Sequence, residues 1–315
     1  MDDEKVLLDD SKKNTCIKVK IPLRISFIGG GTDIPSFYKR FGGVCVNATI
    51  DKYVTVTVKR CFGHPRSLHS DTVKAALDYT GMSEVYVEIE KDLSVQGLGT
   101  SSAVIVGLLK ALYAFQDDTI NEGDLAETAY VLEREILNQP GGKQDFYSAS
   151  YGGLREFRFR NDGKISENTV LNKKQIDSNY LMLFDTGVIR DRSIKAPHES
   201  LNSPQLEILK TLVSPFCSAI SDGNFELMGH LLSAAWSIKK RTHPSISTEK
   251  IGEIYDTAIR TGAWGGKLLG GGGGGAILFV VPLENRERIK SKLELLGTTH
   301  IPFDFSYEGA IRYDK

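Results

Sequence analysis

Apolar and polar residues alternate along the first third of the chain, and this period of two predicts β-strands. Residues 17–28 are the longest example and read IKVKIPLRISFI. The same alternation predicts three further strands, over 44–50, 53–59 and 84–90, with a turn at Asp51 and Lys52 between the first two. Several strands that precede any long helix favour an α+β sheet over strict strand–helix–strand repetition.

Helical patterns begin after residue 100. Residues 101–115, SSAVIVGLLKALYAF, are apolar on every side and predict a buried helix. Residues 122–137 predict an amphipathic helix. The residues expected on its buried face are Leu125, Ala129, Leu132 and Ile136. Pro140, Gly141 and Gly142 interrupt this pattern, and a short helix over 143–150 and a strand over 154–159 are expected after them.

A polar segment over 161–175 separates the two halves of the pattern. We expect a domain boundary there, with one domain over 1–170 and a second over 171–315. The elements expected in the second domain are strands over 181–185 and 276–281, helices over 203–222, 224–241 and 248–261, a glycine-rich loop, and a last helix.

Composition and charge exclude several classes of protein. With 41% hydrophobic and 25% charged residues, the 315-residue chain is neither disordered, collagen-like nor a coiled coil. A net charge of −1 gives no bulk attraction for nucleic acid or an anionic membrane, so neither is expected as a partner. The four cysteines form no CxxC pair, so they resemble neither a zinc site nor a disulfide framework. The N-terminus is acidic, and no stretch approaches the roughly 20 apolar residues of a membrane span, so a cytoplasmic location is expected.

The first segment with recognisable chemistry is GLGTSSA over 97–103, between an expected strand and the apolar helix. Glycines expose backbone N–H groups, and the helix that follows adds its positive dipole end, so the segment predicts a phosphate cradle. Three successive hydroxyls could bind phosphate oxygens or a magnesium ion. The alternative is an ordinary helix capped by Ser or Thr after a turn. The lysine of a Walker-type loop is absent.

The second segment is GGKLL followed by six glycines, Gly270 to Gly275. A flexible linker is the alternative. Apolar residues before the run and a strand pattern directly after it favour a backbone that passes very close to a nucleotide or to the first loop.

Two further segments carry candidate polar groups. In PLRISFIGGGTD over 22–33, Arg24 could bind an anion through its planar fork and Asp33 could accept sugar hydroxyls, although a surface salt bridge fits equally. In EREILNQPGGKQD over 133–145, Asp145 could accept a proton from an attacking hydroxyl, with Lys143 keeping it ionised. Glu133 could complete a magnesium shell or could lie on a solvated helix face.

Taken in order, these four segments resemble the GHMP kinases, the superfamily of galactokinase, homoserine kinase and mevalonate kinase, over most of residues 17–282. SVQGLGTSSAV and KLLGGGGGGA correspond to two motifs of that superfamily. Two departures are visible, because the proline expected before Gly97 is absent and Thr100 replaces the first serine. PLRISFIGGGTDIPSFY, NATIDKYVTVTV and PGGKQD are similar to phrases of the D-glycero-D-manno-heptose 7-phosphate kinases.

The resemblance implies an α+β, two-domain fold, with a ribosomal-protein-S5-like N-terminal domain and a ferredoxin-like C-terminal domain. It implies ATP and Mg²⁺ as cofactors and a sugar phosphate as substrate, with Asp145, Arg24 and Lys143 at the reaction centre. ATP would be bound by Gly97, Leu98, Gly99, Thr100, Ser101, Ser102, Gly272 and Gly273. Mg²⁺ would be held by Ser101 and Glu133. The sugar would be bound by Arg24, Gly30, Gly31, Thr32, Asp33, Gly141, Gly142 and Asp145.

The implied reaction is transfer of the ATP γ-phosphoryl group to the anomeric 1-hydroxyl of the heptose 7-phosphate, on the way to nucleotide-activated heptose for capsule or lipopolysaccharide. The phosphate already on this substrate requires a second anion site, for which Arg190, Arg192 and Lys195 are the candidates; a solvated loop is the alternative. A homodimer is possible. Three other functions remain open: a kinase for fucose, galactose or another sugar, an inactive sugar-sensing homologue, and a decarboxylase of the same superfamily.

Overall fold

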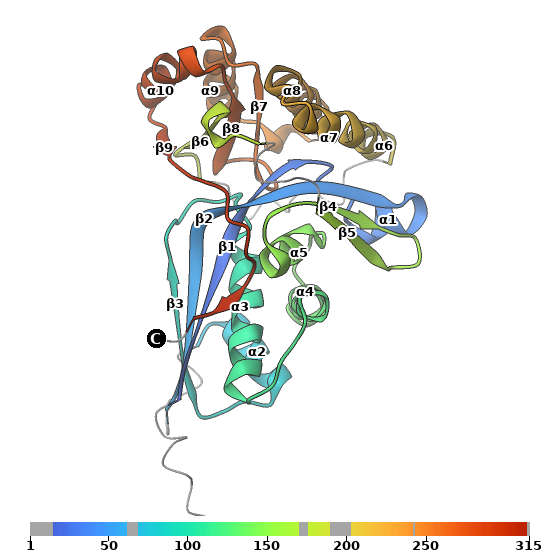
Figure 1. The fold of residues 1–315 in the computed structure, drawn as a ribbon, viewed down its shortest axis with the longest axis vertical. Coiled ribbons are helices and arrows are strands. Elements are labelled where there is room, and N and C mark those ends of the chain that lie inside the picture. The colour runs from blue at the N-terminus through green and yellow to red at the C-terminus, as the bar shows by residue number, and fades with distance from the viewer. Residues whose placement is uncertain (1–14, 62–68, 170–175, 190–202, 242, 314–315) are drawn as a thin grey trace, which may run out of the picture.

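Two antiparallel β-sheets organise the chain in the computed structural model, which describes residues 15–61, 69–169, 176–189, 203–241 and 243–313. The first sheet has the order β10-β1-β2-β4-β5, and β3 also pairs with β2 (Figure 1). Its strands are β1 (Cys16–Ile28), β2 (Gly43–Arg60), β3 (Val85–Lys91), β4 (Leu154–Phe159), β5 (Ile165–Thr169) and β10 (Ile311–Arg312). The candidate anion residues Arg190, Arg192 and Lys195 lie outside the described residues.

The turn expected at Asp51 and Lys52 is wrong, because β2 is one continuous strand of 18 residues. Its pairing with β1 shifts between Pro22, which opposes Tyr53, and Leu23, which opposes Ile50. The two polar residues therefore form a bulge, which inserts extra residues without ending the strand.

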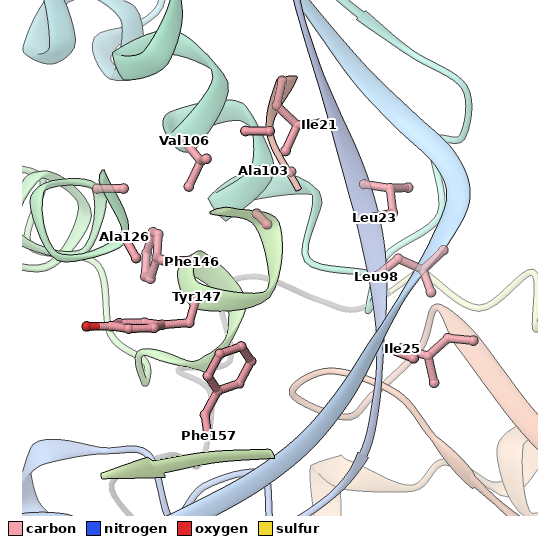
Figure 2. Packing of buried hydrophobic residues seen from close by; sticks show 14 of the residues in the cluster. Ile21, Leu23, Ile25, Leu98, Ala103, Val106, Ala126, Phe146, Tyr147 and Phe157 are labelled. Carbon is pink, nitrogen blue, oxygen red and sulfur yellow. The ribbon is translucent and has the colours of Figure 1, made fainter. Parts of the chain in front are cut away.

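Helices cover one face of the first sheet (Figure 1). They are α2 (Asp71–Thr80), α3 (Thr100–Phe115), α4 (Glu122–Val131) and α5 (Gln144–Tyr151). The central helix α3 packs closely on β1, since a Cβ added at Gly107 would lie 2.3 Å from Ile21 Cδ1. Figure 2 shows this core, with side chains of β1, α3 and α5 meeting between helix and sheet. The short helix α1 (Pro35–Phe41) and α2 were not predicted from the sequence.

The helix expected over 122–137 changes its geometry near its end. Helix α4 stops at Val131, and a π-helical turn runs over Leu132–Ile136. Leu125, Ala129 and Leu132 are buried as expected, but Ile136 is 50% exposed and Glu133 only 6%. The wider i→i+5 turn rotates the last residues relative to an α-helix, so Ile136 turns outward. Glu133, four residues after the buried Ala129, stays on the buried face.

The second sheet has the order β7-β8-β6-β9. Its strands are β6 (Leu181–Asp185), β7 (Gly265–Leu268), β8 (Ala276–Val280) and β9 (Thr299–Ile301), and its helices are α6 (Ser203–Thr211), α7 (Val213–Ser221), α8 (Phe225–Lys240), α9 (Glu249–Arg260) and α10 (Arg286–Glu294). Helices lie between the first and second strands and between the third and fourth, and the strand order is 2-3-1-4. This is the ferredoxin-like arrangement. The helix expected over 203–222 is two helices that meet at Leu212.

After β9 the chain returns to the first sheet. Phe305 forms a β-bridge with Ile50, and β10 pairs with β1 at Val19 and Lys20. The chain leaves the first sheet after β5 and enters the second sheet at β6, and residue 170 lies between these two strands in the sequence. A division of the chain at that residue stays a prediction. Among the described residues, no helix has both the length and the apolar character that a membrane span requires.

Candidate active site

A cavity of about 480 Å³ is lined by both halves of the chain. Its lining comes from β1 and the glycine loop after it, from the start of α3, from the 139–145 turn, and from β7 and the glycines that follow it. Among its residues are Arg24, Gly30, Gly31, Asp33, Gly97, Gly99, Thr100, Ser101, Ser102, Glu133, Gly141, Gly142, Asp145 and Gly272. All four segments chosen from the sequence therefore meet at one place.

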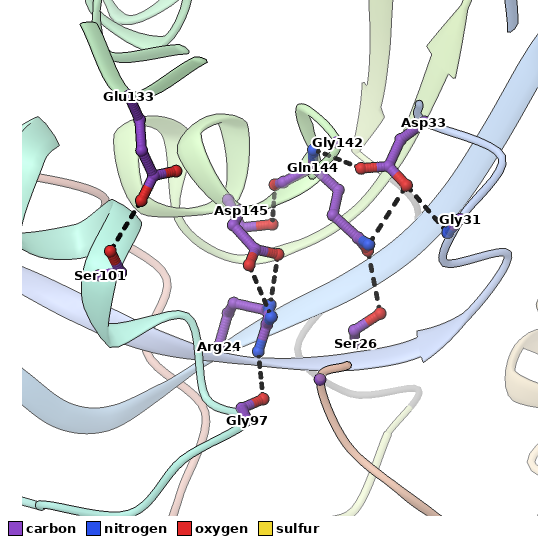
Figure 3. A network of polar contacts seen from close by, with 12 residues as sticks. Arg24, Ser26, Gly31, Asp33, Gly97, Ser101, Glu133, Gly142, Gln144 and Asp145 are labelled. Carbon is purple, nitrogen blue, oxygen red and sulfur yellow. Dashed lines mark hydrogen bonds and ion pairs between the residues drawn. The ribbon is translucent and has the colours of Figure 1, made fainter. Parts of the chain in front are cut away.

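Arg24 and Asp145, which both line this cavity, form a two-pronged ion pair (Figure 3). Arg24 Nε donates to Asp145 Oδ1 and Nη2 to Oδ2, both at 2.8 Å. The remaining prong, Nη1, donates to the carbonyl oxygen of Gly97 at 2.6 Å. One guanidinium thus fixes the orientation of the carboxylate and ties it to the first glycine loop. The alternative of a surface salt bridge fails, because Arg24 is 4% exposed.

On the other side of Asp145, a second network holds Gln144. Ser26 Oγ donates to Gln144 Oε1 at 2.9 Å, while the Gln144 backbone N–H donates to Asp33 Oδ2 at 3.1 Å. Asp33 also accepts the Gly31 N–H at 2.9 Å. Burial raises the pKa of Asp33 above its usual value, and the bonds from the two backbone N–H groups oppose that rise. A Cβ at Gly142 would lie 1.8 Å from Asp33 Oδ2, so only glycine fits there.

The first glycine loop ends at the N-terminus of α3. Gly97 and Gly99 have φ of 95° and 76°, the left-handed region that glycine adopts without strain. Gly99 is the N-cap and no side chain caps the helix, which removes the ordinary capped helix as an explanation. Thr100 Oγ1 is buried without a hydrogen-bond partner. Uncapped N–H groups and an unpartnered hydroxyl on a cavity fit the phosphates of a nucleotide.

The second glycine run packs against the first. A Cβ at Gly270 would lie 2.7 Å from the Cα of Gly97, and one at Gly275 would lie 2.3 Å from the Gln96 carbonyl oxygen. Strands β7 and β8 pair on either side of the run. A flexible linker is therefore excluded, and the glycines allow two backbones to form adjacent walls of one cavity.

Glu133 and Ser101 face each other at the start of α3, where Ser101 Oγ donates to Glu133 Oε1 at 2.7 Å (Figure 3). Burial raises the pKa of Glu133, while its ion pair with Arg134 and the bond from Ser101 lower it. Hard oxygen atoms beside a phosphate cradle suit Mg²⁺, which usually takes one or two protein ligands and completes its shell with phosphate and water. Among the described residues, no group of three or more His, Cys, Asp or Glu side chains could hold a metal ion.

Sequence comparison identifies the fold family. The GHMP kinases N terminal domain matches residues 67–153 and the GHMP kinases C terminal domain matches residues 216–297, together more than half of the chain. The chain belongs to the GHMP kinase family. It is 28% identical to a D-glycero-alpha-D-manno-heptose 7-phosphate kinase of Campylobacter jejuni, over 93% of this chain and 97% of that protein.

Solved structures of GHMP kinases have the same fold. A D-glycero-D-manno-heptose 1-phosphate kinase from Bacteriodes thetaiotaomicron superposes with a TM-score of 0.78 at 23% identity, covering 95% of this chain and 99% of that one. A galactokinase from Lactococcus lactis, in complex with galactose, gives a TM-score of 0.76 at 15% identity and covers 95% of each chain. At these identities the likeness concerns the fold alone.

The expected place of Lys143 in this GHMP kinase is wrong. Its ammonium donates to both carboxylate oxygens of Glu127, at 2.7 and 2.6 Å, and lies 4.7 Å from the centre of the Tyr130 ring. Residues two apart at the start of a helix point in different directions, so Lys143 faces α4 while Asp145 faces the cavity. Arg24 supplies the cation beside Asp145 instead.

Three other residues that were expected to bind ATP or sugar make contacts within the protein instead. Thr32 is fully buried, and its hydroxyl lies within hydrogen-bond distance of the carbonyls of Gly29 and Val44 and accepts the Val44 N–H, so it holds the glycine loop instead of lining the cavity. The Leu98 side chain lies in the core (Figure 2), and its carbonyl accepts the Arg24 N–H. The Gly273 N–H donates to the Ile246 carbonyl, which leaves Gly272 as the cavity-lining member of that pair.

Sequence reasoning missed several residues that line the cavity of the kinase. They are Ser26, Arg134, Gln144, Lys239 and Lys267. Gln144 and Lys267 stand inside phrases already singled out, PGGKQD and KLLGGG, and that position was the available signal. Ser26 and Arg134 also stand inside segments already singled out, PLRISFIGGGTD and EREILNQPGGKQD. Lys239 has no such signal, because its place depends on contact with the distant Gly270 carbonyl.

Proposed function

We propose that this sugar kinase of the GHMP family transfers the γ-phosphoryl group of ATP to the anomeric 1-hydroxyl of D-glycero-D-manno-heptose 7-phosphate, giving the 1,7-bisphosphate. The Arg24–Asp145 pair, held against the first glycine loop, carries the proposal of phosphoryl transfer. The 28% identity to a heptose 7-phosphate kinase over nearly the whole of both chains supports this substrate over fucose or galactose.

In the proposed reaction, the oxygen of the sugar hydroxyl forms a bond to the γ-phosphorus while the bond between that phosphorus and the β–γ bridging oxygen breaks. ADP leaves with the bridging oxygen, and the hydroxyl proton passes to a carboxylate oxygen of Asp145. Phosphoryl transfer demands mainly positioning and charge neutralisation from a protein. Arg24 meets both demands, because it orients Asp145 and adds a positive charge beside the reacting atoms.

The nucleotide phosphates would lie on the N–H groups of Thr100, Ser101 and Ser102. Ser101 and Glu133 would hold Mg²⁺, which when bound neutralises charge on the phosphate oxygens. Asp33 accepts the N–H groups of Gly31 and Gln144, so it fixes Gln144 beside Asp145, and its remaining lone pairs would accept hydroxyls of the sugar. Gly30, Gly31, Gly141 and Gly142 line the same part of the cavity, where the polyhydroxylated ring would bind.

Identification of the reaction product tests the proposed function. The kinase is incubated with D-glycero-D-manno-heptose 7-phosphate, ATP and Mg²⁺, the product mass is measured, and phosphorus NMR locates the new phosphate at the anomeric carbon. An Asp145→Asn preparation, purified identically, controls for contaminating kinases. Turnover of fucose or galactose without turnover of the heptose phosphate would assign another substrate. ATP stability with every sugar tested would favour the inactive sensing homologue.

A further inference from the structure

Lys267 is a buried amine on the cavity that the reaction above does not use. It stands on β7 of the second sheet and is 7% exposed. Its Nζ crosses to the first sheet, where it donates to the carbonyl oxygens of Ser26 and Phe27, both at 2.8 Å. The donor and the two acceptors are 241 and 240 residues apart in the chain, so these two bonds join the two halves of the molecule beside the site.

The two carbonyls belong to an irregular place in β1. Ser26 opposes Asn47 on β2, but Ile28 opposes Val46, so β1 carries one extra residue at Phe27. Such a bulge takes a backbone group out of the sheet ladder, and a buried carbonyl without a partner is costly. Lys267 supplies donors at that point. The glycine loop that starts at Gly29 follows directly, so the clamp fixes where this loop begins.

The same bulge also bears the side chain that holds Gln144. Ser26 Oγ donates to Gln144 Oε1, and Gln144 precedes Asp145. On its own strand, Lys267 stands three residues before Gly270, which packs on Gly97. The Lys267 side chain therefore connects two walls of the cavity. One is the glycine run from Gly270 to Gly275, on the proposed nucleotide side, and the other is the 29–33 loop, on the proposed sugar side.

Two hydrogen bonds to backbone carbonyls are the polar contacts that hold this amine. No carboxylate of the described residues forms an ion pair with it. Burial lowers the pKa of Lys267 well below its usual value, and the nearby cations Lys239 and Arg24 lower it further. An ammonium has three N–H donors and a neutral amine has two, so either form satisfies both carbonyls.

We propose that Lys267 is a positioning residue for the sugar side of the cavity, a two-donor clamp that holds the β1 bulge and, through Ser26 and Gln144, sets the geometry of sugar binding. The proposal rests on the proposed assignment of the sugar side to the 29–33 loop. Lys239 offers a matched contrast, because its ammonium donates to the carbonyl of Gly270 on the nucleotide wall.

The test is steady-state kinetics of Lys267→Met, which keeps an unbranched side chain one atom shorter and removes the donors, against Lys239→Met. The sugar is D-glycero-D-manno-heptose 7-phosphate or, where wild type does not accept it, the best substrate of the sugar panel, so that a wrong substrate and a wrong clamp give different results. We expect Lys267→Met to raise the KM for sugar by about tenfold to a hundredfold while the KM for ATP stays within about twofold. Lys239→Met is expected to raise the KM for ATP more than that for sugar.

An increase in the KM for ATP alone, or no change in either constant for Lys267→Met, overturns the clamp. Lys267→Gln, which retains donors on a shorter arm, is the second variant and is expected to fall between Met and wild type. Where neither variant folds, hydrogen–deuterium exchange of the wild-type protein without ligands tests the clamp. The clamp requires the amides of residues 26–31 to be protected to the same degree as those of 17–25, and fast exchange confined to 26–31 contradicts it.

Discussion

The guanidinium of Arg24 and the carboxylate of Asp145 lie 121 residues apart in the chain and meet through two parallel hydrogen bonds of 2.8 Å. Local structure alone does not determine the position of either side chain. Arg24 is set by β1 and by its third bond to Gly97, while Asp145 is in the first turn of α5. The pair can therefore form only when the strand, the glycine loop and the short helix are assembled correctly.

Asp145→Asn is expected to lower kcat by about 10²–10⁴, the range for loss of a general base. The amide keeps the size of the side chain but cannot take the hydroxyl proton. Binding of Mg·ADP, measured by calorimetry, is expected to stay near that of wild type. A kcat close to normal would show that Asp145 only shapes the site.

Arg24→Lys keeps the positive charge but removes the planar fork, which contacts two oxygens of Asp145 and one of Gly97. We expect kcat to fall by about 10²-fold because the carboxylate is no longer held in one orientation. Kinetics should be compared with Arg40→Lys, a change at the end of helix α1 away from the cavity. Equal activity of the two variants would contradict the role of the fork.

Glu133→Gln is expected to raise the Mg²⁺ concentration needed for half-maximal activity by about tenfold or more, because a carboxylate ligand is lost. Titration of activity with Mg²⁺ at fixed ATP measures this. Glu135→Gln, on the exposed side of the same turn, is the control and should leave the titration unchanged. An unshifted Glu133→Gln curve would place the metal elsewhere.

Glu133 also predicts a pH dependence of stability. Because burial raises its pKa in the folded chain, the native state binds the proton more tightly than the unfolded state does. This group's contribution to the free energy of unfolding is therefore present below its unfolded pKa and lost as pH rises through its folded pKa. Urea unfolding at about pH 4.5 and pH 8 should show Glu133→Gln gaining stability relative to wild type at the higher pH. A constant difference contradicts the raised pKa.

Two helical glycines should respond in opposite ways to alanine. A Cβ at Gly107 in α3 would lie 2.3 Å from Ile21 Cδ1, so Gly107→Ala is expected to destabilise the fold by about 1–3 kcal/mol through overpacking. Gly252 in α9 has no heavy atom within 4 Å of the added carbon. Gly252→Ala is expected to stabilise by about 0.5–1 kcal/mol through helix propensity. Denaturant melts of both variants measure the difference, and stabilisation by Gly107→Ala would contradict the close packing of α3 on the sheet.

Much of the strand and helix pattern could be predicted from hydrophobic periodicity, because burial on one face governs it. The failures have physical causes. A bulge absorbed Asp51 and Lys52 without ending β2, and a π-helical turn moved Ile136 from its expected buried position to an exposed one. Neither event changes the periodic pattern enough to be seen in the sequence.

The site could be predicted as a set of segments, but the direction of individual side chains could not. Lys143 stands two residues from Asp145 in the chain and yet contacts Glu127. Lys267 finds its acceptors about 240 residues earlier, at a bulge that no local signal marks. Proximity in sequence suggested the wrong cation, and only the tertiary structure identifies Arg24 as the partner of Asp145.

The return of the last residues to the first sheet has a consequence for synthesis on the ribosome. Strand β10 covers the free edge of β1, and Phe305 bridges to Ile50 beside it. This edge stays open while the ferredoxin-like half is being translated, because residues 311–312 are synthesised after that half. The N-terminal half thus completes its backbone pairing only once the ferredoxin-like half has been made.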